Sequence, residues 1–444
     1  MPRQSASQIL RVLRPLKWAK KEAMLDIKYI RENRKEVEEM LQKRGSKVDV
    51  AHLLEIDEQR RKLIGEVEEL RRDRKEIAQA KEVEEGRELK QKLNKKGAAL
   101  SAIEAELKEE LLKLPNILLK SVPVGDETAN KIIKKEGEPP KFDFPPKDHV
   151  DLGEALDIID IQRAAKVAGS RFAYLKNEAV LIEFALVSHA FKILVKEGFS
   201  PIIPPELIKK EITDGLGYWQ GGGNENYYLV SDFEISETKE GKPLDLYLIG
   251  TGEHALIPMH ADEIFTQGVL PKRYAAFSHC FRREAGTYGK DTRGILRVHQ
   301  FDKVEMVSFC KPEDDEKERE KMLSVAERLM KDLEIPYRVV ELASGDLALP
   351  SAQTIDIEAW IPSQNKYRET HSISTTTDFQ ARRLNIKYKE GNETKLVHIL
   401  NGTALAIGRT LIAILENYQQ ADGSVKIPQV LHEYLGKDII QRPK

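Results

Sequence analysis

Hydrophobic residues follow a helical period over a long, proline-free stretch between residues 50 and 114. Leucine, isoleucine and valine recur there at three-and-four spacing in two successive series. The first series is Ile56, Leu63, Val67, Leu70 and Ile77, and the second is Leu89, Leu93, Leu100, Ile103, Leu107 and Leu114. Gly86 lies between the two series and predicts a turn. Two narrow seams joined by a short break predict an antiparallel helical hairpin, a coiled-coil arm whose helices are each roughly 45 Å long.

The pattern changes after Pro115. Residues 121–150 contain prolines at 123, 139, 140, 145 and 146 and are interpreted as a linker. From 151 to 444, helical patterns over 164–197 and 316–333 are mixed with strand-like patterns over 274–281, 295–309 and 397–400. This mixture predicts one α+β domain over 151–444, preceded by a separate helical domain over 24–120.

The composition excludes some classes of protein and leaves others open. Lysine plus arginine (71) nearly balances aspartate plus glutamate (73), so net charge does not point to a nucleic-acid partner, although local basic stripes remain possible. Cys280 and Cys310 are the only cysteines, which excludes a disulfide framework and favours a reducing compartment. We expect buried core cysteines rather than a pair or reactive thiols. No run of eighteen apolar residues occurs, so no membrane span is expected.

Residues 277–306 hold an unusual density of charge for a strand hairpin. Charged side chains usually avoid strand interiors, so packing alone does not explain them. Such a hairpin can offer cations to phosphates, an aromatic face to a base and a carboxylate to an ammonium group. The residues concerned are Arg282, Arg283, Glu284, Arg297, Phe301 and Glu305. A merely solvated hairpin face is the alternative.

This segment resembles the second signature motif of class II aminoacyl-tRNA synthetases, and in its extended form that of the seryl-tRNA synthetases. The resemblance runs from about Met24 to the C-terminus. It implies a helical tRNA-binding arm followed by an antiparallel sheet flanked by helices. It also implies ATP-dependent activation of L-serine, transfer to tRNA(Ser) and tRNA(Sec), a Mg²⁺ cofactor, a homodimer and a cytoplasmic location.

The N-terminal residues 1–23 are basic, with no acidic residue before Glu22. They are compatible with a transit-like or RNA-contacting segment. However, members of the resembled family commonly start at the position of Met24. An upstream extension or an alternative start is therefore the preferred interpretation.

Arginines are the expected phosphate ligands, because residues 286–291 lack the spacing and the hydroxyl residue of a P-loop. The resemblance assigns catalytic roles to Arg282 and Arg409. It places Glu284 against the adenine amine and Phe301 against the purine, whereas Phe301 taken alone would be a core aromatic. The full set of ATP-binding residues that it implies is Arg282, Arg283, Glu284, Val298, Phe301, Glu369, Thr370, His371, Ser372 and Arg409.

A third motif begins at Asn401 and leads through Gly402 and Gly408 into an apolar helical run. The resemblance implies that Thr403, with Asn401 nearby, hydrogen-bonds the serine hydroxyl and that Glu305 binds the ammonium group. The serine-binding set that it implies is Thr251, Gly252, Glu253, Arg282, Glu305, Asn401 and Thr403. A site that hydrogen-bonds the substrate hydroxyl can reject an analogue that lacks this group, but exclusion of threonine depends mainly on pocket size.

The resemblance gives Mg²⁺ two ligands, Glu369 and Ser372. Relatives carry cysteines where Ile373 and Thr376 stand here, so no zinc is expected. His371 could titrate or touch ATP, but a passive hydrogen-bonding role is preferred. The segment Gly198–Pro205 resembles the motif that forms the class II dimer interface.

The alternative interpretations differ mainly in the role that they assign to the helical arm. Taken alone, the arm would be a generic oligomerising coiled coil, and its basic residues toward the tip could simply solvate it; they are Arg71, Arg72, Arg74, Lys75, Lys90, Lys92, Lys95 and Lys96. An enzyme that loads an amino acid onto a carrier protein would usually lack the arm. A non-catalytic RNA-binding scaffold would not need the charged residues of the motifs.

Overall fold

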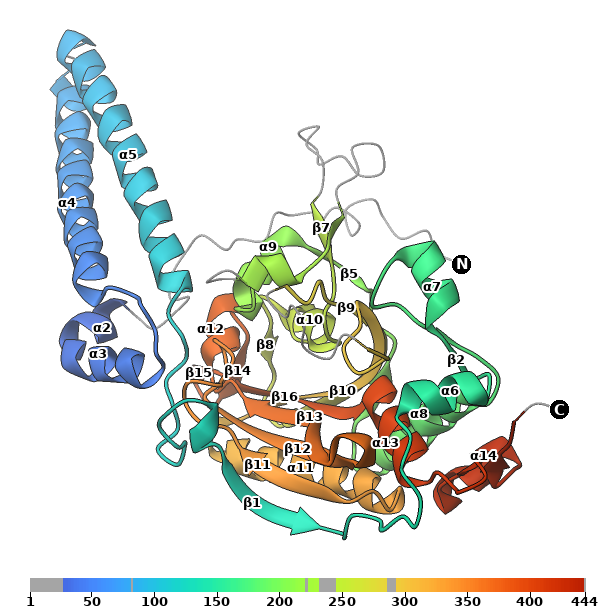
Figure 1. Ribbon diagram of the computed structural model, residues 1–444. Helices are drawn as coiled ribbons and strands as arrows, with labels where there is room; N and C mark the ends of the chain where they lie inside the picture. The colour runs from blue at the N-terminus through green and yellow to red at the C-terminus, as the bar shows by residue number, and fades with distance from the viewer. Residues whose placement is uncertain (1–26, 81–82, 220–222, 231–244, 286–292, 443–444) are drawn as a thin grey trace, which may run out of the picture. The chain divides into compact units, whose positions relative to one another are not determined.

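The computed structural model describes residues 27–80, 83–219, 223–230, 245–285 and 293–442, so the predicted extension 1–23 lies outside these ranges. The chain forms two compact units, Met24–Ile117 and Leu118–Lys444 (Figure 1). Among the described residues, no helix has the length and apolar character needed to cross a membrane.

The N-terminal unit is the expected helical hairpin on a small base. Helices α2 (Ile27–Glu32) and α3 (Arg34–Lys43) pack with the proximal parts of α4 (Val50–Ala80) and α5 (Val83–Leu112). Asp49 caps α4, because its carboxylate accepts from the backbone N–H of Ala51 at 2.8 Å. The prediction of a turn at Gly86 is wrong, since Gly86 lies inside α5.

Two ion pairs fix the register of the arm helices. Lys96 on α5 contacts Glu66 on α4 at 2.6 Å, and Arg60 on α4 contacts Glu104 on α5 at 3.3 Å. The base is closed by buried apolar residues from all four helices, with Ile30, Leu53, Ile56, Leu107 and Leu114 among them. The two helices of the distal arm contact each other only along a narrow apolar seam. Packing within the arm therefore does not explain its length.

The C-terminal unit is built on an eight-stranded sheet in the order β1-β11-β12-β13-β16-β10-β9-β4. All neighbouring strands are antiparallel except β4 and β9, which are parallel. The strands are β1 (Lys131–Glu136), β4 (Ser200–Ile202), β9 (Lys272–Phe281), β10 (Gln300–Cys310), β11 (Tyr337–Glu341), β12 (Gln353–Ile361), β13 (Lys366–Thr375) and β16 (His398–Ala406). The expected antiparallel sheet is thus confirmed, and segment 121–150 contributes its edge strand β1.

Helices cover the sheet with one large apolar core. The core joins α8 (Glu178–Lys196), α11 (Asp315–Asp332) and α13 (Ile407–Asn417) to the strands through residues such as Ile182, Met322 and Leu411. The remaining elements are α6 (His149–Ala155), α7 (Ile161–Ala168), α9 (Lys210–Leu216), α10 (Glu253–Leu256), α12 (Phe379–Leu384), α14 (His432–Leu435), β2 (Ile159–Asp160), β3 (Tyr174–Leu175), β5 (Leu207–Lys209), β6 (Leu229–Val230), β7 (Leu246–Leu248), β8 (Ile264–Phe265), β14 (Lys387–Glu390), β15 (Glu393–Leu396), β17 (Val425–Lys426) and β18 (Ile439–Ile440).

Three predicted boundaries change. The helical pattern over 164–197 is two helices, α7 and α8, because α7 stops at Gly169, where φ is +92°. The strand expected over 295–309 begins only at Gln300, and residues 295–299 form an irregular segment of turns and bends. The strand expected over 397–400 continues to Ala406. The helix expected over 316–333 is present as α11.

Candidate active site

A pocket of about 570 Å³ opens on the face of the central strands, opposite the α11 side. Successive residues of a strand point to opposite faces of the sheet, so it is mainly every second residue of a strand that lines the pocket. Thus Lys303 and Glu305 of β10 line the pocket, whereas Val304 and Met306 enter the apolar core. The same alternation brings Asp356 from β12, Thr370, Ser372 and Ser374 from β13, and Asn401 and Thr403 from β16.

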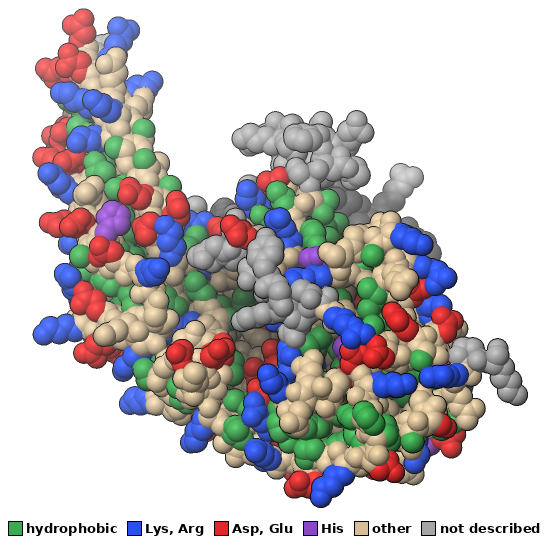
Figure 2. Space-filling view, in the orientation of Figure 1, with side chains coloured by type: hydrophobic (Ala, Val, Ile, Leu, Met, Phe, Trp, Pro, Cys, Tyr) green, Lys and Arg blue, Asp and Glu red, His purple; other side chains and the backbone are tan. Residues whose placement is uncertain are grey.

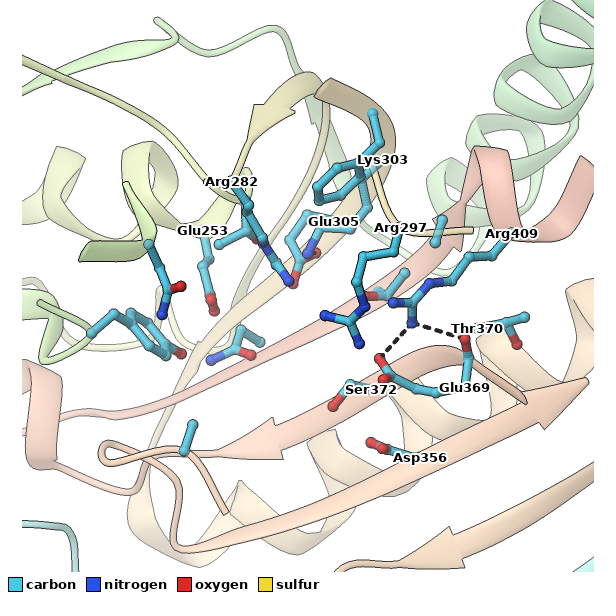
Figure 3. Close-up of a pocket in the computed structure, with 18 of the residues that line it drawn as sticks. Glu253, Arg282, Arg297, Lys303, Glu305, Asp356, Glu369, Thr370, Ser372 and Arg409 are labelled. Atoms are coloured by element: carbon cyan, nitrogen blue, oxygen red, sulfur yellow. Dashed lines mark hydrogen bonds and ion pairs between the residues drawn. The ribbon is translucent and has the colours of Figure 1, made fainter. Parts of the chain in front are cut away.

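One end of the pocket gathers buried polar groups around two carboxylates, Glu253 and Glu305 (Figure 3). Glu305 pairs with Lys303 and lies opposite Thr403 in the β10–β16 ladder. Within the described part of the chain, no hydrogen-bond partner meets Oε2 of Glu253, Oγ1 of Thr251 or Nδ2 of Asn401, although all three are buried. Buried polar atoms are normally paired, so this end is arranged for a small polar ligand.

The charge state of Glu253 follows from its burial. Desolvation, with repulsion from the nearby Glu305, raises the pKa of Glu253 to about 8. Lys303 and Arg282 act in the opposite direction but do not cancel this effect. A cationic ligand beside Glu253 would favour its ionised form.

Arginines occupy the middle and the other end of the pocket. Figure 3 shows Arg282 beside Glu253 and Glu305, and Arg297 between that end and the end that holds Glu369, Ser372 and Arg409. The Arg282 Nε–H donates to the carbonyl of Gly250 at 3.0 Å, and the guanidinium stands 5.2 Å from the centroid of the Phe301 ring. These contacts orient the cation and leave its outer N–H groups directed at the cavity.

The hairpin residue Glu284 is held in a left-handed conformation, with φ at +50°. Such backbone conformations are costly for residues other than glycine and concentrate at functional sites. The Glu284 carboxylate contacts Arg297 at 2.5 Å. Arg297 thereby positions the acid that the family resemblance places against adenine.

At the far end, Arg409 at the start of α13 contacts the carbonyl oxygen and the carboxylate of Glu369 at 2.9 and 3.2 Å. Burial raises the pKa of Glu369, but Arg409 and Arg282 outweigh it and hold that pKa below its usual range. Asp356 lies opposite Ser372 in the β12–β13 ladder, and burial with repulsion from Glu369 raises the pKa of Asp356 well above its usual value.

These groups suit a hard divalent cation. Glu369, Asp356 and the Ser372 hydroxyl are oxygen donors directed at one part of the pocket, and Oδ1 of Asp356 has no hydrogen-bond partner among the described residues. The described residues contain no cluster of three or more His, Cys, Asp or Glu side chains placed to hold a metal. A cation here would therefore depend on the hydroxyl and on ligand oxygens as well.

The structure brings most of the expected site residues to the pocket, but three do not line it. Gly252 lies behind the lining, where an added Cβ would stand 3.1 Å from Cβ of Glu305. Arg283 is exposed, and its backbone N–H donates to Asn226 at 2.8 Å. His371 points into the core and contacts the Thr370 hydroxyl at 2.8 Å, and burial lowers its pKa to about 4. His371 is therefore neutral near pH 7 and reaches the pocket only through Thr370.

Several lining residues were not found by the sequence reasoning. Lys303 could have been found from strand alternation, because it lies between Phe301 and Glu305 on the same strand face. Asp356 had no such signal, since it becomes a site residue only through the pairing of β12 with β13. The others include Tyr218, Asn226, Tyr227, His254 and Thr354.

Comparison with known proteins agrees with this arrangement. The family model described as tRNA synthetase class II core domain (G, H, P, S and T) matches residues 233–418, and that of the seryl-tRNA synthetase N-terminal domain matches residues 24–118. A serine–tRNA ligase of Dictyoglomus turgidum is 45% identical over 436 residues, which cover 95% of this chain and all of that protein.

Two solved structures are also similar. The seryl-tRNA synthetase of Pyrococcus horikoshii, complexed with ATP, superposes with a TM-score of 0.85 at 39% identity, covering 95% of this chain and all of that one. The cytoplasmic serine–tRNA ligase of Naegleria fowleri, in complex with AMP, gives 0.82 at 32% identity over 96% of this chain and all of that one.

The mostly antiparallel sheet, with an Arg-Glu motif on its β9–β10 hairpin and a second arginine in the first turn of α13, defines a class II aminoacyl-tRNA synthetase. Within that class, the chain belongs to the seryl-tRNA synthetase family, and its activity is that of a serine–tRNA ligase.

Proposed function

We propose that this pocket activates L-serine with ATP and that the enzyme then transfers the seryl group to tRNA(Ser), and to tRNA(Sec) where the cell has one. The observation that carries the proposal is the division of the pocket. One end has buried, unpartnered polar atoms that suit a small amino acid, and the other has cations and oxygen donors that suit a triphosphate. Arg282 beside the serine end and Arg297 next to it, toward the triphosphate end, would face the point where the two substrates meet.

The proposed reaction is an in-line attack of the serine carboxylate on the α-phosphate, with pyrophosphate leaving. Arg282 would bind the oxygens on which negative charge increases, and Arg409 would bind the distal phosphates or cover the base opposite Phe301. Glu305 and Glu253 would hold the ammonium group, and Thr403 the hydroxyl. Because the attacking carboxylate is already ionised, the protein needs no general base for this step.

Mg²⁺ fits the residues at the phosphate end. Glu369 and Ser372 would bind it with Asp356 alongside, and the ion would neutralise charge on the phosphate oxygens. Zinc is not proposed, because the segment around Ile373 and Thr376 offers no thiolates.

The decisive experiment is exchange of labelled pyrophosphate into ATP, with and without serine. Serine-dependent exchange supports activation at this pocket, and its absence would refute it. Exchange without acylation of tRNA(Ser) would instead support the carrier-loading alternative. Loss of exchange in Arg282→Ala, with unchanged thermal unfolding, would assign the chemistry to this site.

The arm is proposed to bind the tRNA. Its distal surface carries exposed Arg71, Arg72, Lys75, Lys92 and Lys95, which can neutralise phosphates. Figure 2 shows that acidic side chains are interspersed with these bases along the arm. The arm would therefore follow a backbone of defined shape rather than attract any polyanion.

The enzyme is also proposed to be a cytoplasmic homodimer. The outer face of α8 exposes Leu181, Phe184 and Val195, and Ile203, just after β4, is 87% exposed. Such a group of apolar side chains on the motif that resembles the class II dimer interface supports self-association. The two buried, unpaired cysteines, Cys280 and Cys310, support a reducing compartment.

A further inference from the structure

Within the motif hairpin, the segment that leads into β10 is fastened to the N-terminal part of α6. Arg293 contacts Asp148 at 2.9 Å and Asp151 at 2.5 Å. Two residues later, the backbone N–H of Ile295 donates to Nε2 of His149 at 3.2 Å. These contacts lie directly before Ile295–Val298, the irregular stretch that lines the pocket.

The contact with His149 is tight enough to require a glycine. Gly294 has φ at +83°, and a Cβ added there would lie 2.0 Å from His149 Nε2. Any side chain at this position would therefore displace the histidine ring or the segment. The backbone of the hairpin and the imidazole are thus fitted to one another.

The other side of the imidazole is held by the helix that carries Arg409. Glu416, near the end of α13, is completely buried, and its Oε1 lies 3.1 Å from both Nδ1 and the backbone N of His149. Its second oxygen accepts from the N–H of Ser363 at 3.0 Å. This arrangement defines the tautomer, because Nδ1–H donates to Glu416 and the bare Nε2 accepts from Ile295.

We propose that His149 is a positioning residue for ATP. It joins Glu416 of α13, which begins with the Arg409 turn, to Ile295 in the segment that leads into β10, and so sets the spacing of the two segments that enclose the nucleotide end of the pocket. The inference rests on the proposed binding of ATP there. It assigns His149 no contact with substrate, and none with the serine end.

Two substitutions separate the two contacts of the ring. In His149→Asn the side-chain amide reaches the position of Nδ1, so it keeps the bond to Glu416 and loses the bond to Ile295. In His149→Gln the amide reaches the position of Nε2 and can still accept from Ile295, while the backbone N–H of residue 149 keeps its own bond to Glu416. We expect the asparagine variant to raise KM for ATP about tenfold, the equivalent of one lost hydrogen bond, and the glutamine variant to stay within about twofold.

The measurement is pyrophosphate exchange with ATP and serine varied separately. KM for serine should be unchanged in both variants. Equal effects of the two substitutions, or a parallel rise in both KM values, would show a purely structural role and overturn the proposal. If wild-type enzyme shows no serine-dependent exchange, the proposed function itself fails, which is a different result.

A second pair of variants covers the case in which both histidine substitutions unfold the protein. Gly294→Ala should raise KM for ATP, because its methyl group displaces His149. Gly268→Ala is the matched control, with φ at +85° and no atom within 4 Å of the added Cβ. Both share the backbone strain, so equal KM values for ATP in the two variants would also overturn the proposal.

Discussion

At the residue scale, the serine end of the pocket is a balance of buried charges. Glu253 and Glu305 are both nearly inaccessible, and Lys303 compensates only one of them directly. Binding of an amino acid would add an ammonium group near the carboxylates and a carboxylate near Arg282. Glu253 therefore lacks a direct cationic partner among the described residues, and its burial, with repulsion from Glu305, raises its pKa to about 8.

This balance predicts a pH dependence of serine binding. The ammonium group prefers an ionised Glu253, and the fraction ionised increases as pH rises through about 8. KM for serine in pyrophosphate exchange should therefore fall about tenfold between about pH 7 and 8.5, because each unit below the pKa removes most of the carboxylate. Glu253→Gln should have a high KM without this slope. A pH-independent KM in the wild type would contradict the assignment.

A second prediction concerns Asp356, whose Oδ1 faces the proposed cation site without a hydrogen-bond partner. Asp356→Asn should raise the Mg²⁺ concentration for half-maximal exchange roughly tenfold, the size typical of a lost supporting ligand. KM for serine should not change. Glu358→Gln is the control, because Glu358 lies on the same strand but pairs with Arg338 away from the pocket. Equal Mg²⁺ curves for Asp356→Asn and wild type would refute the role.

How far sequence predicts the site also depends on the residue. Arg282, Glu284 and Glu305 share one hairpin, so local spacing was enough to place them together. His371 adjoins two pocket residues in sequence, yet strand alternation turns it into the core, so adjacency in sequence does not place it in the pocket lining. Asp356 and His149 depend on contacts between distant segments, which no local pattern encodes.

At the scale of elements, the helical period predicted the arm but not where its helices end. Gly86 was chosen as the turn because glycine interrupts a helical pattern, yet it costs only about 1 kcal/mol inside a helix and its added Cβ would meet Ile77 at 3.9 Å across the hairpin. At Gly169 the error was the opposite one. The helical pattern over 164–197 was predicted to continue through this glycine, yet Gly169 ends α7. Pairing with the neighbouring helix decides which glycine becomes a boundary.

The arm gives a prediction at this scale. Replacing residues 68–97 by a short glycine linker removes the distal basic surface but keeps the packed base around Ile56 and Leu107. We expect serine-dependent pyrophosphate exchange to be retained within about twofold, and acylation of tRNA(Ser) to be lost, because the phosphate contacts supply most of the affinity. Charging at the wild-type rate would refute the proposed role of the arm. Circular dichroism would confirm that the base remains folded.

At the scale of the whole molecule, one edge of the large sheet and the helix beside it remain to be explained. Leu181, Phe184 and Val195 lie at helical spacing on the outer face of α8, which packs beside β4, the last strand of the sheet. A monomer would leave this stripe in water, at a cost that scales with its apolar area. A twofold dimer would bury it against a second copy of the same surface.

Phe184→Glu tests this arrangement. Because a twofold interface contains each residue twice, the substitution places two carboxylates in an apolar contact, and such charges cost several kcal/mol when desolvated. We expect sedimentation velocity to show monomer for Phe184→Glu and dimer for the wild type at the same micromolar concentration. Val124→Glu is the matched control, since Val124 is 59% exposed and its neighbour Gly125 contacts Ser344, just after β11 at the opposite edge. A dimeric Phe184→Glu protein, or equal dissociation of both variants, would show that α8 does not form the interface.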